Sequence, residues 1–240
     1  MQVPQRGLIV WVDGVEGVGK TTLIVKLKKR LKILHPDLCR DNGNIECTRF
    51  PNDNAFAIPA RSFLLSRPND GGDIFGYIAN ILSHVENIIM PIVKGGGIVL
   101  CDRSILSALA LQLNGHPGDS MMILDMLSKR SEVWDFVKHH SLVYLVSGQC
   151  DRIHSQLKER GVKNSRDDLS VGDIVSQTMN FRVALHCLNK SAQIGLEIDI
   201  DHAFTQILMD IGQWYGTSRR KTRIQSKLAD IRDWATALVY

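Results

Sequence analysis

The stretch Asp13-Gly14-Val15-Glu16-Gly17-Val18-Gly19-Lys20-Thr21-Thr22 decides the fold of this chain. Its residues fit the pattern G-x-x-x-x-G-K-[ST] without a mismatch. The preceding run, residues 8–12, is continuously apolar, as a buried parallel strand should be. The leucines after the loop recur at helical spacing, at positions 23, 27, 31 and 34. The order of strand, glycine loop and helix is the context in which this motif binds the phosphates of a nucleotide.

Each residue type in the loop has a physical role. Glycines at 14, 17 and 19 let backbone N–H groups turn inward around an anion, and the helix N-terminus adds the positive end of its dipole. The Lys20 ammonium is expected to reach the outer phosphates, and the Thr21 hydroxyl is expected to ligate Mg²⁺, with Thr22 beside it. The loop therefore predicts that ATP and Mg²⁺ bind here.

Composition limits the remaining possibilities. A chain of 240 residues that is 44% hydrophobic has room for one sizeable core, so we expect one domain with a lid or tail. No apolar run has the length of a membrane span, and the first six residues do not resemble a signal peptide. The five cysteines are scattered, which predicts reduced thiols, a cytoplasmic location and no structural zinc. The net charge of +4 is as well explained by phosphate substrates as by nucleic acid.

The rest of the chain alternates between strand-like and helix-like segments. Further strands are predicted at 44–48, 98–101, 142–146 and 194–198, and helices at 55–66, 73–93, 104–113, 121–138, 151–160, 173–189 and 203–214. This alternation predicts an α/β P-loop NTPase fold, with a five-stranded parallel sheet and helices on both faces. Ligands should then bind at the carboxyl ends of the strands, where Arg49 and Arg103 also fall.

Two segments are set apart from this core. The polar residues at about 151–170 predict a lid, within a kinase domain of residues 1–215. Residues 216–240 are a basic appendage whose apolar residues recur at helical spacing. A helix packed on the body of the protein explains the appendage better than a contact with nucleic acid.

Taken together, these motifs resemble the thymidylate kinase family of nucleoside monophosphate kinases, from about Gly7 to Ile211. The residues that carry the resemblance are the glycine loop, Arg49-Phe50-Pro51, Ala79-Asn80 with His84-Val85-Glu86, Asp102-Arg103 with Ser107 and Gln112, and Lys158-Glu159-Arg160-Gly161. The P-loop alone is shared by many activities, whereas the combination is far more specific.

The resemblance implies a role for each matching residue. Arg103 and Arg49 would bind the acceptor phosphate with a guanidinium fork, although both also fit ordinary surface arginines. Asp102 would hold the hydration shell of Mg²⁺, or cap the following helix, or do both. Glu16 would meet the sugar 3′-hydroxyl, or would be a solvated loop acid.

Further roles follow for the base and for the lid. Tyr77, Phe50 and Gln112 would contact the acceptor nucleotide, Tyr77 by stacking on its base. Arg160 and Arg166, with Arg152 as a weaker candidate, would close over the transferring phosphoryl group beside Lys20 and Arg103. For each lid arginine a solvated polar helix is an equally good interpretation.

The match is weakest in the base pocket. Ile81 stands where the family usually has an arginine, Ser104 and Leu111 where it has tyrosines, and Gln156 where it has a first lid arginine. The pocket is therefore either rebuilt for thymidylate or adapted to another base, such as a modified pyrimidine. Such a pocket would suit a virus-encoded enzyme that works in the host cytoplasm.

The sequence thus predicts transfer of the ATP γ-phosphate to a deoxynucleoside 5′-monophosphate, with thymidylate as the expected acceptor. The resemblance also implies a homodimer, and neither a membrane nor a nucleic-acid partner is expected. Two alternatives stay open. One is a deoxynucleoside kinase of the same fold, which would need a carboxylate base after the second strand, where Arg49-Phe50 stands. The other is a P-loop nucleotide switch or ATPase.

Overall fold

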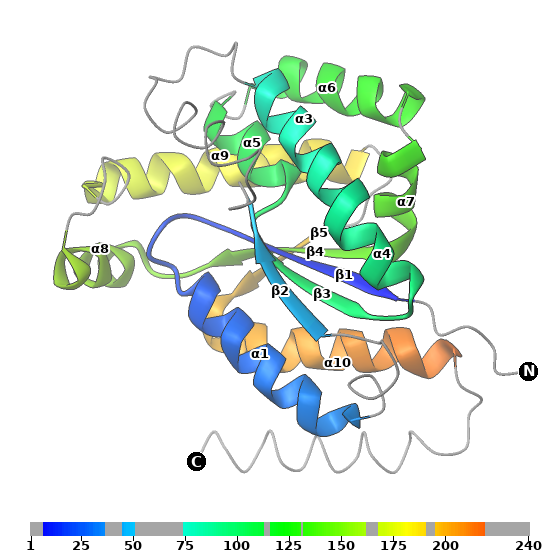
Figure 1. Cartoon of the computed structure of the whole chain (residues 1–240). Helices are drawn as coiled ribbons and strands as arrows, with labels where there is room; N and C mark the ends of the chain where they lie inside the picture. Colours follow the sequence, from blue (N-terminus) through cyan, green and yellow to red (C-terminus); the bar gives the residue numbers. More distant parts are fainter. Residues whose placement is uncertain are drawn as a thin grey trace, which may run out of the picture.

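A five-stranded parallel sheet forms the centre of the molecule (Figure 1). The computed structural model describes residues 7–36, 45–50, 74–112, 116–130, 132–161, 168–190 and 195–218. Its strands are β1 (Leu8–Asp13), β2 (Ile45–Arg49), β3 (Ile98–Asp102), β4 (Ser141–Ser147) and β5 (Gly195–Asp199), in the order β2-β3-β1-β4-β5. Every adjacent pair is parallel. The predicted fold class and all five strands are confirmed.

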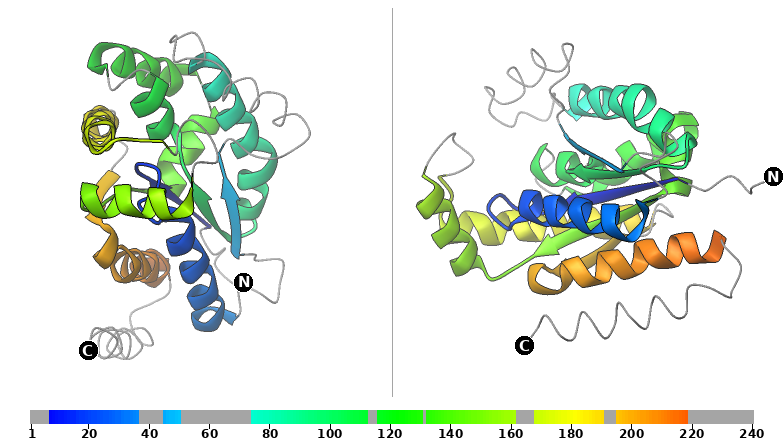
Figure 2. Two further views of the ribbon diagram at one scale, coloured as in Figure 1. Left: turned by 90° about the vertical axis from the view of Figure 1, so that its left-hand side faces the viewer. Right: turned by 60° about the horizontal axis from the view of Figure 1, so that its bottom comes forward.

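Helices cover both faces of this sheet. On one face lie α1 (Lys20–Leu34) and α10 (Ile200–Ser218), which pack against each other (Figures 1 and 2). On the other face lie α3 (Ile74–His84), α4 (Met90–Lys94), α5 (Ile105–Gln112), α6 (Pro117–Arg130), α7 (Glu132–His140) and α9 (Val171–Lys190). Helix α8 (Cys150–Arg160) lies beyond the carboxyl ends of the strands, where the predicted lid begins.

The single helix predicted over residues 121–138 is wrong, because two helices occupy this segment. Helix α6 packs on α9, whereas α7 contacts β1 and buries Trp134 and Val137. The apolar residues of the two halves therefore face different neighbours. The sequence pattern shows apolar residues at helical spacing throughout this segment. It does not reveal that the second half packs against a different part of the protein from the first.

A π-helical turn, η2 (Val85–Ile89), joins α3 to α4 inside the predicted helix 73–93. The N–H of Met90 donates to the carbonyl of Val85, five residues earlier. Pro91 follows directly, has no N–H to donate, and would clash with a carbonyl in a regular helix. Widening the helix by one residue at this point lets the chain pass the proline without ending the helix.

Burial along the strands explains where a ligand can approach. All six residues of β1 are buried, whereas the edge strands β2 and β5 expose several positions. The centre of the sheet is therefore closed on both faces, and its side chains are accessible only where the strands end. Those carboxyl ends carry the glycine loop and the residues that follow β2 and β3.

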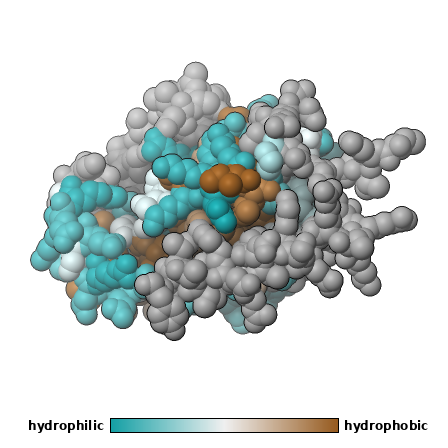
Figure 3. All heavy atoms as spheres, turned by 90° about the horizontal axis from the view of Figure 1, so that it is seen from below, coloured by the Kyte–Doolittle hydropathy of each residue, from teal (hydrophilic) through white to brown (hydrophobic). Residues whose placement is uncertain are grey.

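The surface on the α1–α10 side is mainly hydrophilic among the described residues, with a few apolar side chains between the polar ones (Figure 3). Val25 and Ile33 of α1 are the exposed large apolar residues of that helix. None of the helices in the described part has both the length and the hydropathy to span a bilayer. The predicted helix at 55–66 and the appendage, apart from the end of α10 at Ser218, lie outside the described residues.

Candidate active site

The glycine loop between β1 and α1 has the left-handed backbone that its glycines permit. Gly14, Gly17 and Gly19 have φ angles of 143°, 82° and 101°. A Cβ on Gly14 would lie 2.4 Å from the carbonyl oxygen of Val146, and one on Gly17 would lie 2.7 Å from Cγ of Leu157. Neither position has room for a side chain, so the loop shape depends on these glycines.

Lys20 lies along the inside of this loop. It is buried, and its Nζ donates hydrogen bonds to the carbonyl oxygens of Gly14 at 3.0 Å and Val15 at 2.9 Å. Burial lowers the pKa of Lys20 to about 8, and the positive charge of Arg103 acts in the same direction. The two carbonyl groups compensate the buried charge of the Lys20 ammonium only in part. A phosphate group at this position would provide a full anionic partner.

Asp102, the last residue of β3, faces the first turn of α1. The hydroxyl of Thr21 donates to its Oδ2 at 2.8 Å. Its Oδ1 is buried and has no hydrogen-bond partner among the described residues. A buried carboxylate oxygen without a partner, next to a hydroxyl, fits the few oxygen ligands that a protein gives to Mg²⁺ in a phosphate site. The two predicted metal residues therefore come together.

Asp13 has a role that the sequence interpretation missed. This fully buried carboxylate accepts four hydrogen bonds, two from N–H groups (both 3.1 Å) and two from hydroxyls (2.5 and 2.6 Å) of Ser104 and Ser107. Burial raises its pKa, although the hydrogen bonds from these serines oppose the rise. Asp13 thus connects the start of α5 to the end of β1. The sequence feature that could have indicated this role is a carboxylate at the end of an otherwise apolar strand.

This arrangement decides the question of the helix cap. The hydroxyl oxygen of Ser104 accepts a hydrogen bond from the N–H of Leu106 at 3.0 Å. The carboxylate of Asp13 accepts hydrogen bonds from the N–H groups of Ser104 and Ser107. Asp102 accepts none of these hydrogen bonds. The alternative that Asp102 caps the following helix is therefore wrong, because Ser104 and Asp13 already satisfy those donors.

Arg103 leaves the sheet in an unusual conformation. Its φ of 79° is the left-handed region that non-glycine residues seldom occupy, and its N–H donates to the carbonyl of Val12 at 2.9 Å. The guanidinium donates to Ser107 Oγ at 3.3 Å and to Glu16 Oε2 at 2.5 Å. The turn at Arg103 directs its side chain back over the glycine loop.

Glu16 is the point at which the cationic groups meet. Arg160, the last residue of α8, donates to its Oε1 through Nη1 and Nη2, both at 3.3 Å. Burial alone would raise the pKa of Glu16, but the charges of Lys20, Arg103 and Arg160 lower it to about 2. The interpretation of Glu16 as a solvated loop acid is therefore wrong. One predicted lid arginine, Arg160, does reach the site.

Arg152 occupies a different place. It forms an ion pair with Asp201, with Nη1 at 3.1 and 3.0 Å from the two carboxylate oxygens, and so connects α8 to the first turn of α10. Arg166 lies outside the described residues, and the side chains of Tyr77 on α3 and Gln112 on α5 are not described either. The roles proposed for these three residues stay predictions.

The end of β2 reaches the same edge of the sheet. Arg49 is its last residue, is exposed, and pairs in register with Asp102. Phe50 is buried, and its N–H donates to the carbonyl of Asp102 at 2.8 Å. The predicted phosphate-binding segment after β2 thus lies beside the predicted metal residue on β3.

Two of the positions that depart from the family pattern face the interior. Ile81 and Ser104 are buried, and the Ser104 hydroxyl is committed to Asp13, whereas Leu111 is half-buried. The hydrogen bond to Asp13 therefore explains why a serine occupies position 104. Gln156 is exposed on α8.

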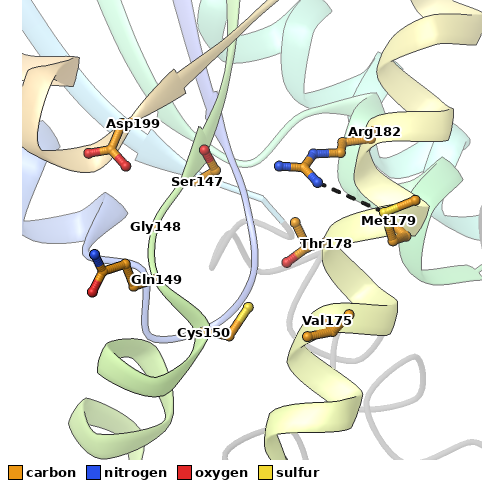
Figure 4. Close-up of a pocket in the computed structure, with 9 residues that line it drawn as sticks. All are labelled: Ser147, Gly148, Gln149, Cys150, Val175, Thr178, Met179, Arg182 and Asp199. Atoms are coloured by element: carbon orange, nitrogen blue, oxygen red, sulfur yellow. Dashed lines mark hydrogen bonds between the residues drawn. The ribbon is translucent and has the colours of Figure 1, made fainter.

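A separate cavity of about 320 Å³ lies between the loop after β4 and helix α9 (Figure 4). Arg182 points into it from α9, with Nη1 3.9 Å from Sδ of Met179, and also forms a bidentate contact with Glu197. The remaining lining comes from Ser147, Gly148, Gln149, Cys150, Val175, Thr178 and Asp199. None of the predicted site residues lines this cavity.

Comparison with known proteins agrees with this geometry. The family model described as thymidylate kinase matches residues 12–130. A thymidylate kinase from Neorickettsia sennetsu is 32% identical over 120 residues, which are 50% of this chain and 57% of that protein. One from Halothermothrix orenii is 36% identical over 114 residues, 46% of this chain and 52% of that protein.

Residues 12–130 belong to the thymidylate kinase family. The matched region spans only about half the length of these curated relatives. The family region contains the glycine loop, Arg49, Asp102 and Arg103, whereas Arg160 lies beyond it.

The fold resemblance extends further along the chain. The crystal structure of a thymidylate kinase from Ehrlichia chaffeensis superposes with a TM-score of 0.59, covering 85% of this chain and 98% of that one. At 18% identity this resemblance establishes the fold alone. Its coverage of 85% nevertheless shows that the fold resemblance continues past residue 130.

Proposed function

We propose that this protein transfers the γ-phosphoryl group of ATP to the 5′-phosphate of a deoxynucleoside monophosphate, with thymidylate as the expected acceptor. The observation that carries the proposal is the convergence of Arg103 and Arg160 on Glu16, beside the buried Lys20. These three cations come from α1, the end of β3 and the end of α8. Their charges are strong enough together to hold Glu16 ionised far below its usual pKa.

Such a cluster suits the chemistry of phosphoryl transfer. The transferring group spreads negative charge over its oxygens, and fixed cations stabilise that charge without having to move during the step. Lys20 would bind the donor phosphates, and Arg103 and Arg160 would exchange Glu16 for phosphate oxygens as the substrates enter. Glu16 would then be available for a hydroxyl of the acceptor sugar.

Thr21 and Asp102 are the residues that would hold Mg²⁺. Asp102 Oδ1, which has no partner among the described residues, and the Thr21 hydroxyl are a donor set that suits a hydrated magnesium ion. Bound there, the ion would neutralise charge on the donor phosphates. In this scheme Thr21 also fixes the orientation of Asp102.

The acceptor is proposed to be a phosphate and not a hydroxyl. A phosphate oxygen is already anionic and needs no general base, whereas a hydroxyl needs a carboxylate to take its proton. At the end of β2, where a deoxynucleoside kinase would carry that carboxylate, this chain has Arg49 and Phe50. A cation at this position favours an anionic acceptor.

The test is an ADP-release assay with ATP, Mg²⁺ and a panel of deoxynucleoside monophosphates and nucleosides. We expect turnover on thymidylate and a loss of at least about 10³-fold in Lys20→Ala, because the donor phosphates would lose their principal cation. Turnover on thymidine but not thymidylate would favour the deoxynucleoside kinase. ATP hydrolysis without any acceptor would favour the switch or ATPase.

Three further expectations belong to this proposal. The protein would form a homodimer, which sedimentation velocity would detect. Residues of about 151–170 would act as the lid of a domain that covers residues 1–215, and residues 216–240 would be an appendage. A cytoplasmic location would follow from the need to meet ATP and a deoxynucleotide together.

A further inference from the structure

Asn80, on α3, has a side-chain amide oxygen with no hydrogen-bond partner in the described part of the chain. The residue is only 4% exposed, and its Oδ1 is buried without a hydrogen-bond partner among the described residues. Leaving a buried amide oxygen unpaired costs about 1–3 kcal/mol. An apolar side chain of the same size would avoid that cost, as Ile78 and Ile81 do on the same helix.

The neighbouring turn of α3 shows which way Asn80 faces. His84 lies four residues further on, so the two side chains share one face of the helix. The His84 ring is buried, and its Nε2 lies 2.7 Å from the hydroxyl oxygen of Thr48, in β2. The face that Asn80 shares with His84 therefore looks toward β2.

The direction of α3 places Asn80 nearer to the candidate site than His84 is. The helix continues through η2 and α4 to the amino end of β3, so it runs away from the carboxyl edge of the sheet (Figure 1). Four residues of helix measure about 6 Å. Since Thr48 is the last but one residue of β2, Asn80 lies at the level of Arg49 and Phe50 or beyond them.

The chemistry of an acceptor nucleotide limits what an amide oxygen at this level can meet. Such a ligand offers hydrogen-bond donors only on its sugar hydroxyls and on the N–H groups of its base. Glu16, on the glycine loop, contacts Arg103 and is the residue proposed above to meet the sugar. Helix α3 lies on the face of the sheet opposite α1, on the side of β2 and β3 (Figure 1). A base that extends away from the glycine loop across these strands would therefore approach α3.

We propose that Asn80 determines base specificity, by accepting a hydrogen bond at Oδ1 from an N–H of the acceptor's base. The donor is a ring N–H, as in thymine, or an exocyclic amino group, as in cytosine. This inference rests on the proposed function. A site built to accept such a hydrogen bond rejects ligands that lack the donor, because its own oxygen then stays unpaired.

The experiment compares the full-length wild-type protein with Asn80→Leu and Asn80→Asp. Each protein is titrated with thymidylate, deoxycytidylate and N3-methylthymidylate, whose methyl group removes the ring N–H, and is then assayed for turnover with ATP. Asn87→Leu is the matched control, because Asn87 is an exposed asparagine on the same continuous helix that donates to the carbonyl of Ser83.

We expect Asn80→Leu to weaken binding of the preferred monophosphate by about 10–100-fold. It should also reduce the discrimination against N3-methylthymidylate or between the two pyrimidines, while the KM for ATP stays unchanged. Asn80→Asp keeps an acceptor oxygen and should keep most of the selectivity. The midpoint of urea unfolding should not fall in Asn80→Leu, since the unpaired group is gone.

Unchanged base selectivity in Asn80→Leu would overturn the inference, as would equal weakening of all three ligands together with a lower unfolding midpoint. The thymidylate and deoxycytidylate arms distinguish the ring N–H from the amino group. A wild-type protein that binds monophosphates selectively but does not phosphorylate them would overturn the proposed function and not the role of Asn80. A wild-type protein that binds no monophosphate would overturn both.

Discussion

Replacing Asp13 tests the contact that binds α5 to β1. In Asp13→Ala, four hydrogen bonds disappear. The N–H of Ser104 then loses its acceptor at the start of a buried helix, whereas the N–H of Ser107 keeps its 3.2 Å contact with the carbonyl of Ser104. Each buried donor left unpaired costs about 1–3 kcal/mol, while the serine hydroxyls can turn to other partners. We therefore expect the free energy of unfolding to fall by about 3–5 kcal/mol.

Asp13→Asn should be much milder. Oδ1 receives three of the four hydrogen bonds, and an amide oxygen in that place keeps them. Only the hydroxyl of Ser104, which now donates to Oδ2, would meet an amide nitrogen in place of an acceptor. The expected loss is about 1–2 kcal/mol.

Urea unfolding, followed by tryptophan fluorescence, measures both losses. Asp125→Asn is the matched control, because Asp125 is exposed and its carboxylate forms an i,i+4 ion pair with the exposed Lys129. That change should stay within about 0.5 kcal/mol. Equal losses of stability in Asp13→Asn and Asp13→Ala would refute the idea that the loss follows the number of hydrogen bonds removed. Losses no larger than that of the control would show that the contact between Asp13 and the start of α5 does not stabilise the fold.

The remaining predictions concern the charged groups of the site. Because burial lowers the pKa of Lys20 to about 8, ATP binding near that pH should take up protons and weaken as the pH rises further; calorimetry in buffers of different ionisation heat measures this, and no uptake would contradict it. Although burial opposes it, nearby cations lower the pKa of Glu16 from 4.5 to about 2, so its contribution to stability is complete above pH 4.5 and is lost toward pH 2; unfolding curves of Glu16→Gln should lack that loss. Arg160→Ala should lower kcat by about 10–1000-fold in steady-state kinetics, whereas Arg152→Ala, paired with Asp201, should change it much less; equal effects would remove Arg160 from the mechanism.

The sequence predicted the features that depend on local pattern. The glycine loop, the strands and the residues after β2 and β3 were all found, because an unbroken apolar run or a fixed motif marks each of them. Arg160 was proposed through the family resemblance, since nothing in a polar helix end distinguishes one arginine from another, and its catalytic role stays a prediction. Its contact with Glu16 spans 144 residues of sequence, and no spacing rule reaches that far.

Other features depend on which partner each residue meets. The role of Asp13 arises only when serines more than ninety positions later come against it. The split between α6 and α7 reflects a change of packing neighbour, and the π-helical turn reflects how the helix passes Pro91. The unpaired oxygen of Asn80 is likewise a property of the packed structure, because an asparagine in a helical pattern predicts an exposed position as readily as a buried one.

The left-handed backbone at Arg103 costs stability, whereas its side chain supplies a cation to the candidate site. An arginine held at φ 79° gives up about 1–2 kcal/mol that a glycine would not. Glycine at this position would relieve that strain, but it would also remove a cation that helps to stabilise the ionised form of Glu16. A library screened for heat resistance alone would set the relieved strain against the lost ion pair, whereas one screened for the proposed phosphoryl transfer should retain arginine at position 103. Stabilising campaigns on this scaffold therefore have to leave that residue fixed.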